Sequence, residues 1–261
     1  MRAFFGVVAV SLFALVSGAA SAAQVDVAKM KAAKQAADQF LALAKGSETS
    51  GRVPRQSDPK VKPLLDKVFN NAALGSETLP LGESGKIGEL LANGNRVGMA
   101  YFLAGTGTTE PDKLASDPQA LQRADRNVTE FAPEIGHWFD FQIGIQNAIA
   151  ESVLVFLSSA SKEVLERPNV KSGLGDVRGG LARSLSGIFQ TMSAEGLNDA
   201  WRRDRLAALA VIAPKASKLL TPEDASALQS QATELAETVR DPTVQAGLKK
   251  LAATIAPAGN R

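Results

Sequence analysis

Apolar residues three and four positions apart recur along nearly the whole chain, and this spacing constrains the fold more than any other feature of the sequence. In a helix it gathers the apolar side chains on one face, whereas a half-buried strand would need sustained alternation, which is almost absent. Several segments also begin with a capping residue followed by Pro, as at Asp117-Pro118 and Thr221-Pro222. The sequence therefore predicts an all-α protein.

Nine helical segments can be delimited, so we expect a multi-helix bundle of about eight or nine helices packed around a central apolar helix. They start near Asp26, Asp58, Lys86, Asp117, Pro133, Val170, Asp199, Pro222 and Pro242, and the fifth runs to about Glu166. Gly94 and Gly98 lie inside the third segment. Each weakens a helix by about 1 kcal/mol relative to Ala, and such glycines permit close contact with a neighbouring helix.

The N-terminus has the three parts of a secretory signal peptide. Arg2 gives a positive start, residues 3–16 are almost all apolar, and Ala20 and Ala22 form the small-residue pattern of a cleavage site. The apolar run is shorter than the roughly 20 residues that a membrane-spanning helix needs. We therefore expect residues 1–22 to be removed, the mature chain to be periplasmic, and no membrane span to remain in it.

No long linker rich in Pro, Gly or Ser divides the mature chain. Residues 23–261 are therefore expected to form a single helical domain, with a weak seam near Arg167-Pro168. Three helix starts resemble one another, but they are unevenly spaced, which argues against a stacked repeat with a fixed period.

The composition excludes several classes of site. The chain has no Cys and one His, which rules out cysteine-ligated zinc, iron–sulfur clusters, thiol nucleophiles and sites with two imidazoles. Its 29 basic and 27 acidic residues leave a formal net charge of +2, which provides no excess positive field for binding a nucleic acid. We expect no metal, no cofactor and no nucleic-acid partner.

The segment that starts at Pro133 is apolar on nearly every side, which is typical of the central helix of a bundle. Polar residues nonetheless follow it at spacings of three and four, and they form one stripe, here called the polar stripe: His137, Asp140, Asn147 and Glu151, with Gly144 among them. Buried carboxylates are costly unless they are paired. The polar stripe must therefore face water, a cavity or charged groups on another helix.

Two interpretations of the polar stripe are open. In the first, Asp140, Glu151 and His137 are catalytic candidates in a cleft that raises a carboxyl pKa, and His137, Trp138, Asp140, Asn147 and Glu151 are ligand-binding candidates. In the second, the stripe is a structural network in which His137 bonds Asp140 or Glu134 and Glu151 pairs with Arg178 or Arg183. Asp140 and Glu151 would lie about 16 Å apart along the helix, too far to act together on one bond.

The run Trp201-Arg202-Arg203-Asp204-Arg205 is a second candidate, because its three guanidinium groups could bind an anion or an acidic partner. Asp199 precedes Arg203 by four residues, however, so a solvated helix face with ion pairs also accounts for the run.

Three functional hypotheses follow. The first is a non-enzymatic periplasmic protein that binds an apolar or amphipathic small molecule, or a partner protein, in a cavity beside the central helix. The second is a carboxylate-dependent hydrolase acting on cell-wall material, with Glu151 or Asp140 as the general acid. The third is a structural or assembly role, which would require exposed apolar area.

Overall fold

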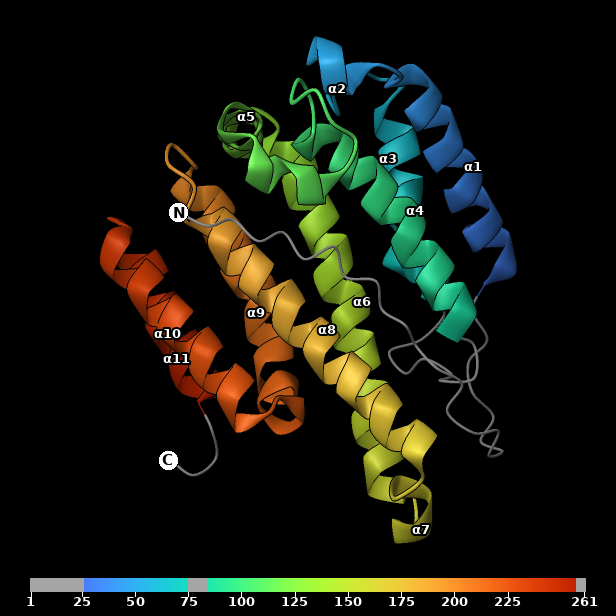
Figure 1. The fold of residues 1–261 in the computed structure, drawn as a ribbon, viewed down its shortest axis with the longest axis vertical. Helices are drawn as coiled ribbons and strands as arrows, with labels where there is room; N and C mark the ends of the chain where they lie inside the picture. Colours follow the sequence, from blue (N-terminus) through green and yellow to red (C-terminus); the bar gives the residue numbers. More distant parts are fainter. Residues whose placement is uncertain (1–25, 75–83, 257–261) are drawn as a thin grey trace.

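The computed structural model describes residues 26–74 and 84–256, and within these two ranges every regular element is helical and no strand occurs. The predicted all-α class is confirmed. Figure 1 shows the arrangement of the elements in the described ranges. They are α1 (Val27–Leu43), α2 (Ser47–Ser50), α3 (Lys62–Val68), η1 (Asn71–Leu74), α4 (Ser84–Phe102), η3 (Pro111–Ser116), α5 (Pro118–Glu130), α6 (Ala132–Ser159), α7 (Lys162–Leu165), α8 (Pro168–Met192), α9 (Asp199–Leu219), α10 (Pro222–Thr238) and α11 (Pro242–Ile255).

The expected number of eight or nine helices is too low, because short helices occupy segments that were predicted otherwise. Helix α2 lies in what reads as a polar loop after α1. The long helix predicted to reach Glu166 ends at Ser159 instead, where the Ser159 hydroxyl donates to the carbonyl of Val155. Ser161 then caps the separate helix α7 by accepting a hydrogen bond from the amide of Val164. Ser159 is thus the last residue of α6, and Ser161 is the N-cap of α7.

One predicted helix start is wrong. Asp58-Pro59 was expected to open a helix, but α3 begins at Lys62 with Pro63 in its first turn. The Asp58 carboxylate accepts a hydrogen bond from the amide of Lys60, two residues ahead, and so closes a tight turn rather than capping a helix. The other capping predictions hold: Asp26, Asp117 and Thr221 each accept from an amide of the helix that follows.

Helix α6 joins two groups of helices. On one side it packs against α4, which in turn packs against α1; on the other side it packs against α9, which contacts α11 (Figure 1). Helix α10 contacts both α11 and α8. Helix α6 matches the expected central apolar helix only in part: most side chains of residues 134–153 are buried, but beyond them the helix emerges, and Val155 is 48% exposed.

Helix α6 is also the one helix among the described residues that is long and apolar enough to cross a membrane. Half of its most apolar window is buried against the helices described above, as in the core helix of a globular domain. The predicted signal peptide, residues 1–22, lies outside the described residues and stays a prediction, as does the single-domain organisation.

Helix α4 approaches α6 closely because it carries glycines at the contact. A Cβ atom on Gly98 would lie 2.1 Å from Cδ2 of Trp138, and one on Gly94 would lie 2.3 Å from Cε1 of Phe141. Real carbon atoms cannot come so near, so both aromatic rings rest directly on the backbone of α4. The expectation that these two glycines permit close helix contact is confirmed.

Candidate functional site

Three residues of the polar stripe, Asp140, Asn147 and Glu151, face charged side chains of α9. The Asp140 carboxylate accepts a hydrogen bond from Arg205 at 2.7 Å. Ten residues further along α9, nearly three turns, the ammonium group of Lys215 lies 2.9 Å from Asn147 Oδ1 and 2.9 Å from a carboxylate oxygen of Glu151. Both acidic residues of the stripe are therefore paired with a cation from the neighbouring helix.

The Asp140–Arg205 pair is the more buried of the two. The Arg205 side chain is 8% exposed and lies over the Trp201 ring at 5.1 Å, while the Asp140 side chain is 44% exposed. Burial raises the pKa of Asp140 above its usual range, although the attraction of Arg205 opposes this shift. Burial lowers the pKa of Arg205, against the opposing effect of Asp140. The carboxylate thus serves to neutralise a cation buried between two helices.

The network hypothesis paired Glu151 with Arg178 or Arg183, and this prediction is wrong. Helix α9 lies beside this face of α6, and its Lys215 pairs with Glu151 instead. A shallow hollow of about 410 Å³ borders Glu151, between the last turns of α6 and α9. Its wall includes Pro214, Lys215 and Lys218, and within the described residues no second carboxylate lines it. The two carboxylates that glycoside hydrolysis requires are not brought together there.

His137 lies at the N-terminal end of the polar stripe. Its ring meets Phe69 edge to face with the centroids 5.1 Å apart, and its buried Nδ1 has no hydrogen-bond partner among the described residues. Burial lowers its pKa, so the imidazole is neutral near pH 7. The predicted bond from His137 to Asp140 or Glu134 is wrong: Glu134 instead accepts from the backbone amide of Gln56 at 2.8 Å.

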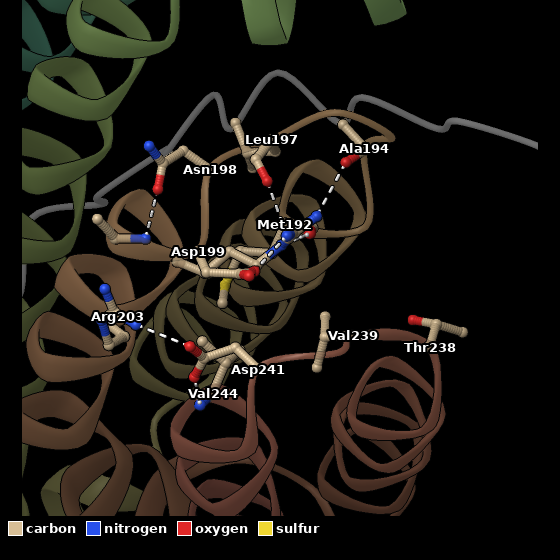
Figure 2. Close-up of polar contacts among 12 residues, drawn as sticks. Met192, Ala194, Leu197, Asn198, Asp199, Arg203, Thr238, Val239, Asp241 and Val244 are labelled. Atoms are coloured by element: carbon tan, nitrogen blue, oxygen red, sulfur yellow. Dashed lines mark hydrogen bonds and ion pairs between the residues drawn. The ribbon is translucent and has the colours of Figure 1, made fainter.

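The arginine run of α9 is engaged in contacts within the molecule (Figure 2). Arg202 donates to the carbonyls of Met192, Ala194 and Leu197 and to the carboxylate of Asp199, and so holds the connection between α8 and α9. Arg203 donates to Asp241 at 2.8 Å, beside the start of α11. The predicted partner of Asp199 was Arg203; the structure gives it Arg202, three residues away. Each of the three guanidinium groups has a carboxylate partner within the molecule.

A groove of about 830 Å³ lies between the end of α1, the short helix α2 and the outer face of α4, and is here called the α1–α4 groove. Its apolar wall is formed by Leu41, Leu91, Ala92, Met99, Ala100 and Leu103. These side chains come from α1, from one face of α4 and from the residue after it. Leu91 and Leu103 are buried, Leu41, Met99 and Ala100 are half-buried, and Ala92 is exposed.

Polar groups occupy two places in the α1–α4 groove. At the α2 end lie Lys45, Glu48 and Thr109. Halfway along α4 lie Asn95 and Arg96, of which Arg96 donates to Asp38 at 3.1 Å. An apolar trough with a few polar groups is the usual form of a site for a small amphipathic molecule.

Trp138 connects the polar stripe's helix to the α1–α4 groove. Its indole Nε1 donates to Oδ1 of Asn95 at 3.2 Å, and Gln142 donates to the same oxygen at 2.8 Å. Trp138 itself is 95% buried, so it supports the wall of the groove from behind. Of the predicted ligand-binding residues, Trp138 is the one that contacts a groove residue.

The groove residues were not identified from the sequence. The apolar face of α4 looks like any core-facing stripe, and whether another helix covers it depends on tertiary packing that the spacing does not encode. The pair Asn95-Arg96 gave no distinct signal, because the same helix also carries Lys86, Glu89 and Asn93.

Comparison of the chain with models of protein families, with curated protein sequences and with solved structures finds no match.

Proposed function

We propose that this protein is an exported, non-enzymatic binding protein and that it holds an amphipathic small molecule in the α1–α4 groove. The observation that carries this proposal is the combination of a partly exposed apolar face on α4 with polar groups at the end and the middle of the same groove. The proposed cavity therefore lies beside α4, and not beside the central helix α6.

The size of the α1–α4 groove supports a small ligand. Its volume of about 830 Å³ falls within the roughly 300–1,000 Å³ typical of ligand sites. The wall consists of flexible and small side chains, such as Met99 and Ala92, and lacks aromatic rings. Such a wall suits a flexible chain of methylene groups, since Met adapts to irregular apolar shapes.

The periplasmic location in this proposal rests on the signal-peptide pattern of residues 1–22. It is tested by expressing the full chain in a bacterium and measuring the intact mass of the protein in the periplasmic fraction. The mass should equal that of residues 23–261. Retention of residues 1–22, or recovery of the protein only in the cytoplasm, would contradict export.

The binding function is tested with N-phenyl-1-naphthylamine, a neutral probe whose fluorescence rises in apolar surroundings. The probe should bind the wild-type protein, and the variant Ala92→Trp should lose binding because Ala92 is exposed on the groove wall, where an indole fills the groove without entering the core. The matched control is Ala227→Trp, at an exposed position of α10 outside the α1–α4 groove.

Equal probe binding by wild type, Ala92→Trp and Ala227→Trp would contradict the proposal, because the probe would then bind elsewhere. Circular dichroism of each variant separates loss of binding from loss of folding.

The hydrolase hypothesis stays a prediction. The ion pairs of Asp140 and Glu151 favour a structural role for both carboxylates, and the groove contains neither of them. Turnover of cell-wall material by the wild type that is abolished in Glu151→Gln, with folding intact, would revive it.

A further inference from the structure

The side chain of Asn95 has a fixed orientation, and this orientation defines the chemistry that the α1–α4 groove accepts. An indole nitrogen can only donate a hydrogen bond, so the atom of Asn95 that faces Trp138 Nε1 must be the carbonyl oxygen. Gln142 donates to the same oxygen. A flipped amide would set the Asn95 NH2 against the indole N–H, so the two ends of this side chain are not interchangeable.

The NH2 group of Asn95 is therefore the end that remains for the groove. Asn95 lines the groove, and among the described residues no acceptor bonds its nitrogen. The neighbouring apolar side chains, Leu91 and Met99, offer it none. A hydrogen-bond donor on an apolar wall is best satisfied by an acceptor that arrives with the ligand.

The charges near Asn95 favour an acceptor that is negative. Arg96 lines the same part of the groove, and Asp38 occupies one side of its guanidinium group, which leaves donors for a ligand. Lys45, at the α2 end, has no ion-pair partner among the described residues. Glu48 is the one acidic side chain on the groove wall, and it lies at the far end from Asn95.

We propose that the α1–α4 groove takes a long-chain monocarboxylate, whose carboxylate accepts a hydrogen bond from Asn95 Nδ2 beside Arg96 while its alkyl chain lies along the apolar face of α4. This inference rests on the proposed binding function and adds the head group of the ligand. Trp138 and Gln142 act as positioning residues, because they hold the amide of Asn95 with its NH2 toward the groove.

The test compares ligands with the same chain and different head groups. Dodecanoate, dodecyl phosphate, dodecylamine and dodecanol are used to displace N-phenyl-1-naphthylamine from the wild-type protein. Dodecanoate should displace the probe at a concentration about tenfold or more below that of dodecanol or dodecylamine, the change expected for one hydrogen bond to a charged group.

The variant Asn95→Asp removes the donor and keeps the support behind it, because an aspartate oxygen still accepts from Trp138 and Gln142. It should lose the preference for dodecanoate while the neutral probe still binds. Asn198→Asp is the matched control for charge: Asn198 caps α9 outside the groove, and Asp caps a helix equally well. This variant should keep the wild-type preference.

An independent readout uses the two tryptophans of the chain as reporters. In a ¹⁵N–¹H spectrum of the wild-type protein, the indole signal of Trp138 should move when dodecanoate binds, because its acceptor Asn95 gains a new partner. The signal of Trp201, whose indole donates to the carbonyl of Ala132, should stay in place. This experiment needs no variant and decides the question even where Asn95→Asp does not fold.

Three results overturn the inference. If the probe binds but all four head groups displace it equally, or dodecylamine is preferred, the groove binds ligands and the assigned head group is wrong. If dodecyl phosphate is preferred over dodecanoate, the site is for an alkyl phosphate. If the probe does not bind at all, the proposed function itself fails, and the carboxylate assignment fails with it.

Discussion

Helix α6 is held by two contacts of different physical character. Toward α4 the contact is close and uncharged, because Trp138 and Phe141 rest on the backbone at Gly98 and Gly94. Toward α9 the same helix presents charged side chains, and Arg205 and Lys215 pair with Asp140 and Glu151. Both contacts include close packing, since Trp201 of α9 lies against the backbone of α6 at Gly136, but the ion pairs occur in the second. The ion pairs make Asp140 and Glu151 part of a helix-packing surface, and the α1–α4 groove lies on the other side of α4.

The largest effect is expected from Gly98→Ala, which adds one methyl group to the close contact. Its Cβ would lie 2.1 Å from the rigid indole of Trp138, which cannot move aside as a flexible chain end could. Overpacking of this kind costs typically about 1–3 kcal/mol, and we expect about 3 kcal/mol here in chemical denaturation.

The matched control is Gly88→Ala on the same helix, where a Cβ meets nothing within 4 Å. Because Ala has the higher helix propensity, this variant should gain up to about 1 kcal/mol. Equal stability changes in the two variants would show that the close contact between α4 and α6 is not as described.

The contact with α9 should tolerate change better. Asp140→Asn leaves Arg205 without its counter-charge in a largely buried position, and we expect a loss of about 1–2 kcal/mol, reduced from that of a fully buried pair because Asp140 is partly exposed. Glu110→Gln, which breaks the exposed pair of Glu110 with Lys113, should change stability by less than about 0.5 kcal/mol. If Asp140→Asn lowers the free energy of unfolding no more than Glu110→Gln does, the Asp140–Arg205 pair does not stabilise the contact between α6 and α9.

A smaller effect should appear as a pH dependence at His137. Burial lowers its pKa below 6.5 in the folded protein, so the unfolded chain takes up a proton first as the pH falls. The stability that His137 contributes is complete above pH 6.5 and is lost as the pH falls through the folded pKa. From about pH 7.5 to about pH 5, the wild type should lose more stability than His137→Gln.

The folded pKa of His137 can be read directly by NMR, because the chain has a single histidine. A titration midpoint at or above 6.5 would contradict the burial of its ring beside Phe69.

The smallest effect is expected from Glu151→Gln. The Lys215–Glu151 pair is about one-third exposed, and Lys215 keeps its hydrogen bond to Asn147 in the variant, so the free energy of unfolding should change by less than about 1 kcal/mol. A larger loss, measured by the same denaturation assay, would place the second ion pair among the main supports of α9.

Local features of this fold could be predicted from the sequence, because they depend on neighbouring residues. Asp117 and Thr221 cap the helices that follow them, as their positions before Pro indicate. The helix start predicted at Asp58 was wrong for a related reason. The same Asp-Pro pair also suits a tight turn, in which the carboxylate accepts a hydrogen bond from the amide two residues ahead.

The partners of the polar stripe could not be predicted, because they depend on which helix packs beside α6. Lys215 lies 64 residues after Glu151, and nothing in its local sequence distinguishes it from an exposed lysine. The stripe itself was predicted to face water, a cavity or charged groups on another helix, and for Asp140 and Glu151 the structure shows the third of these surroundings. The α1–α4 groove was missed because an apolar helix face has the same spacing whether or not another helix covers it.

The most direct test of a ligand-binding role is native mass spectrometry of the mature protein, purified gently from the periplasm and compared with the same sample after denaturation. The account predicts an added mass that corresponds to a long-chain monocarboxylate, that leaves on denaturation, and that is absent from Ala92→Trp but present in Ala227→Trp. A wild-type protein that carries no added mass, and that gains none when dodecanoate is supplied, would contradict it.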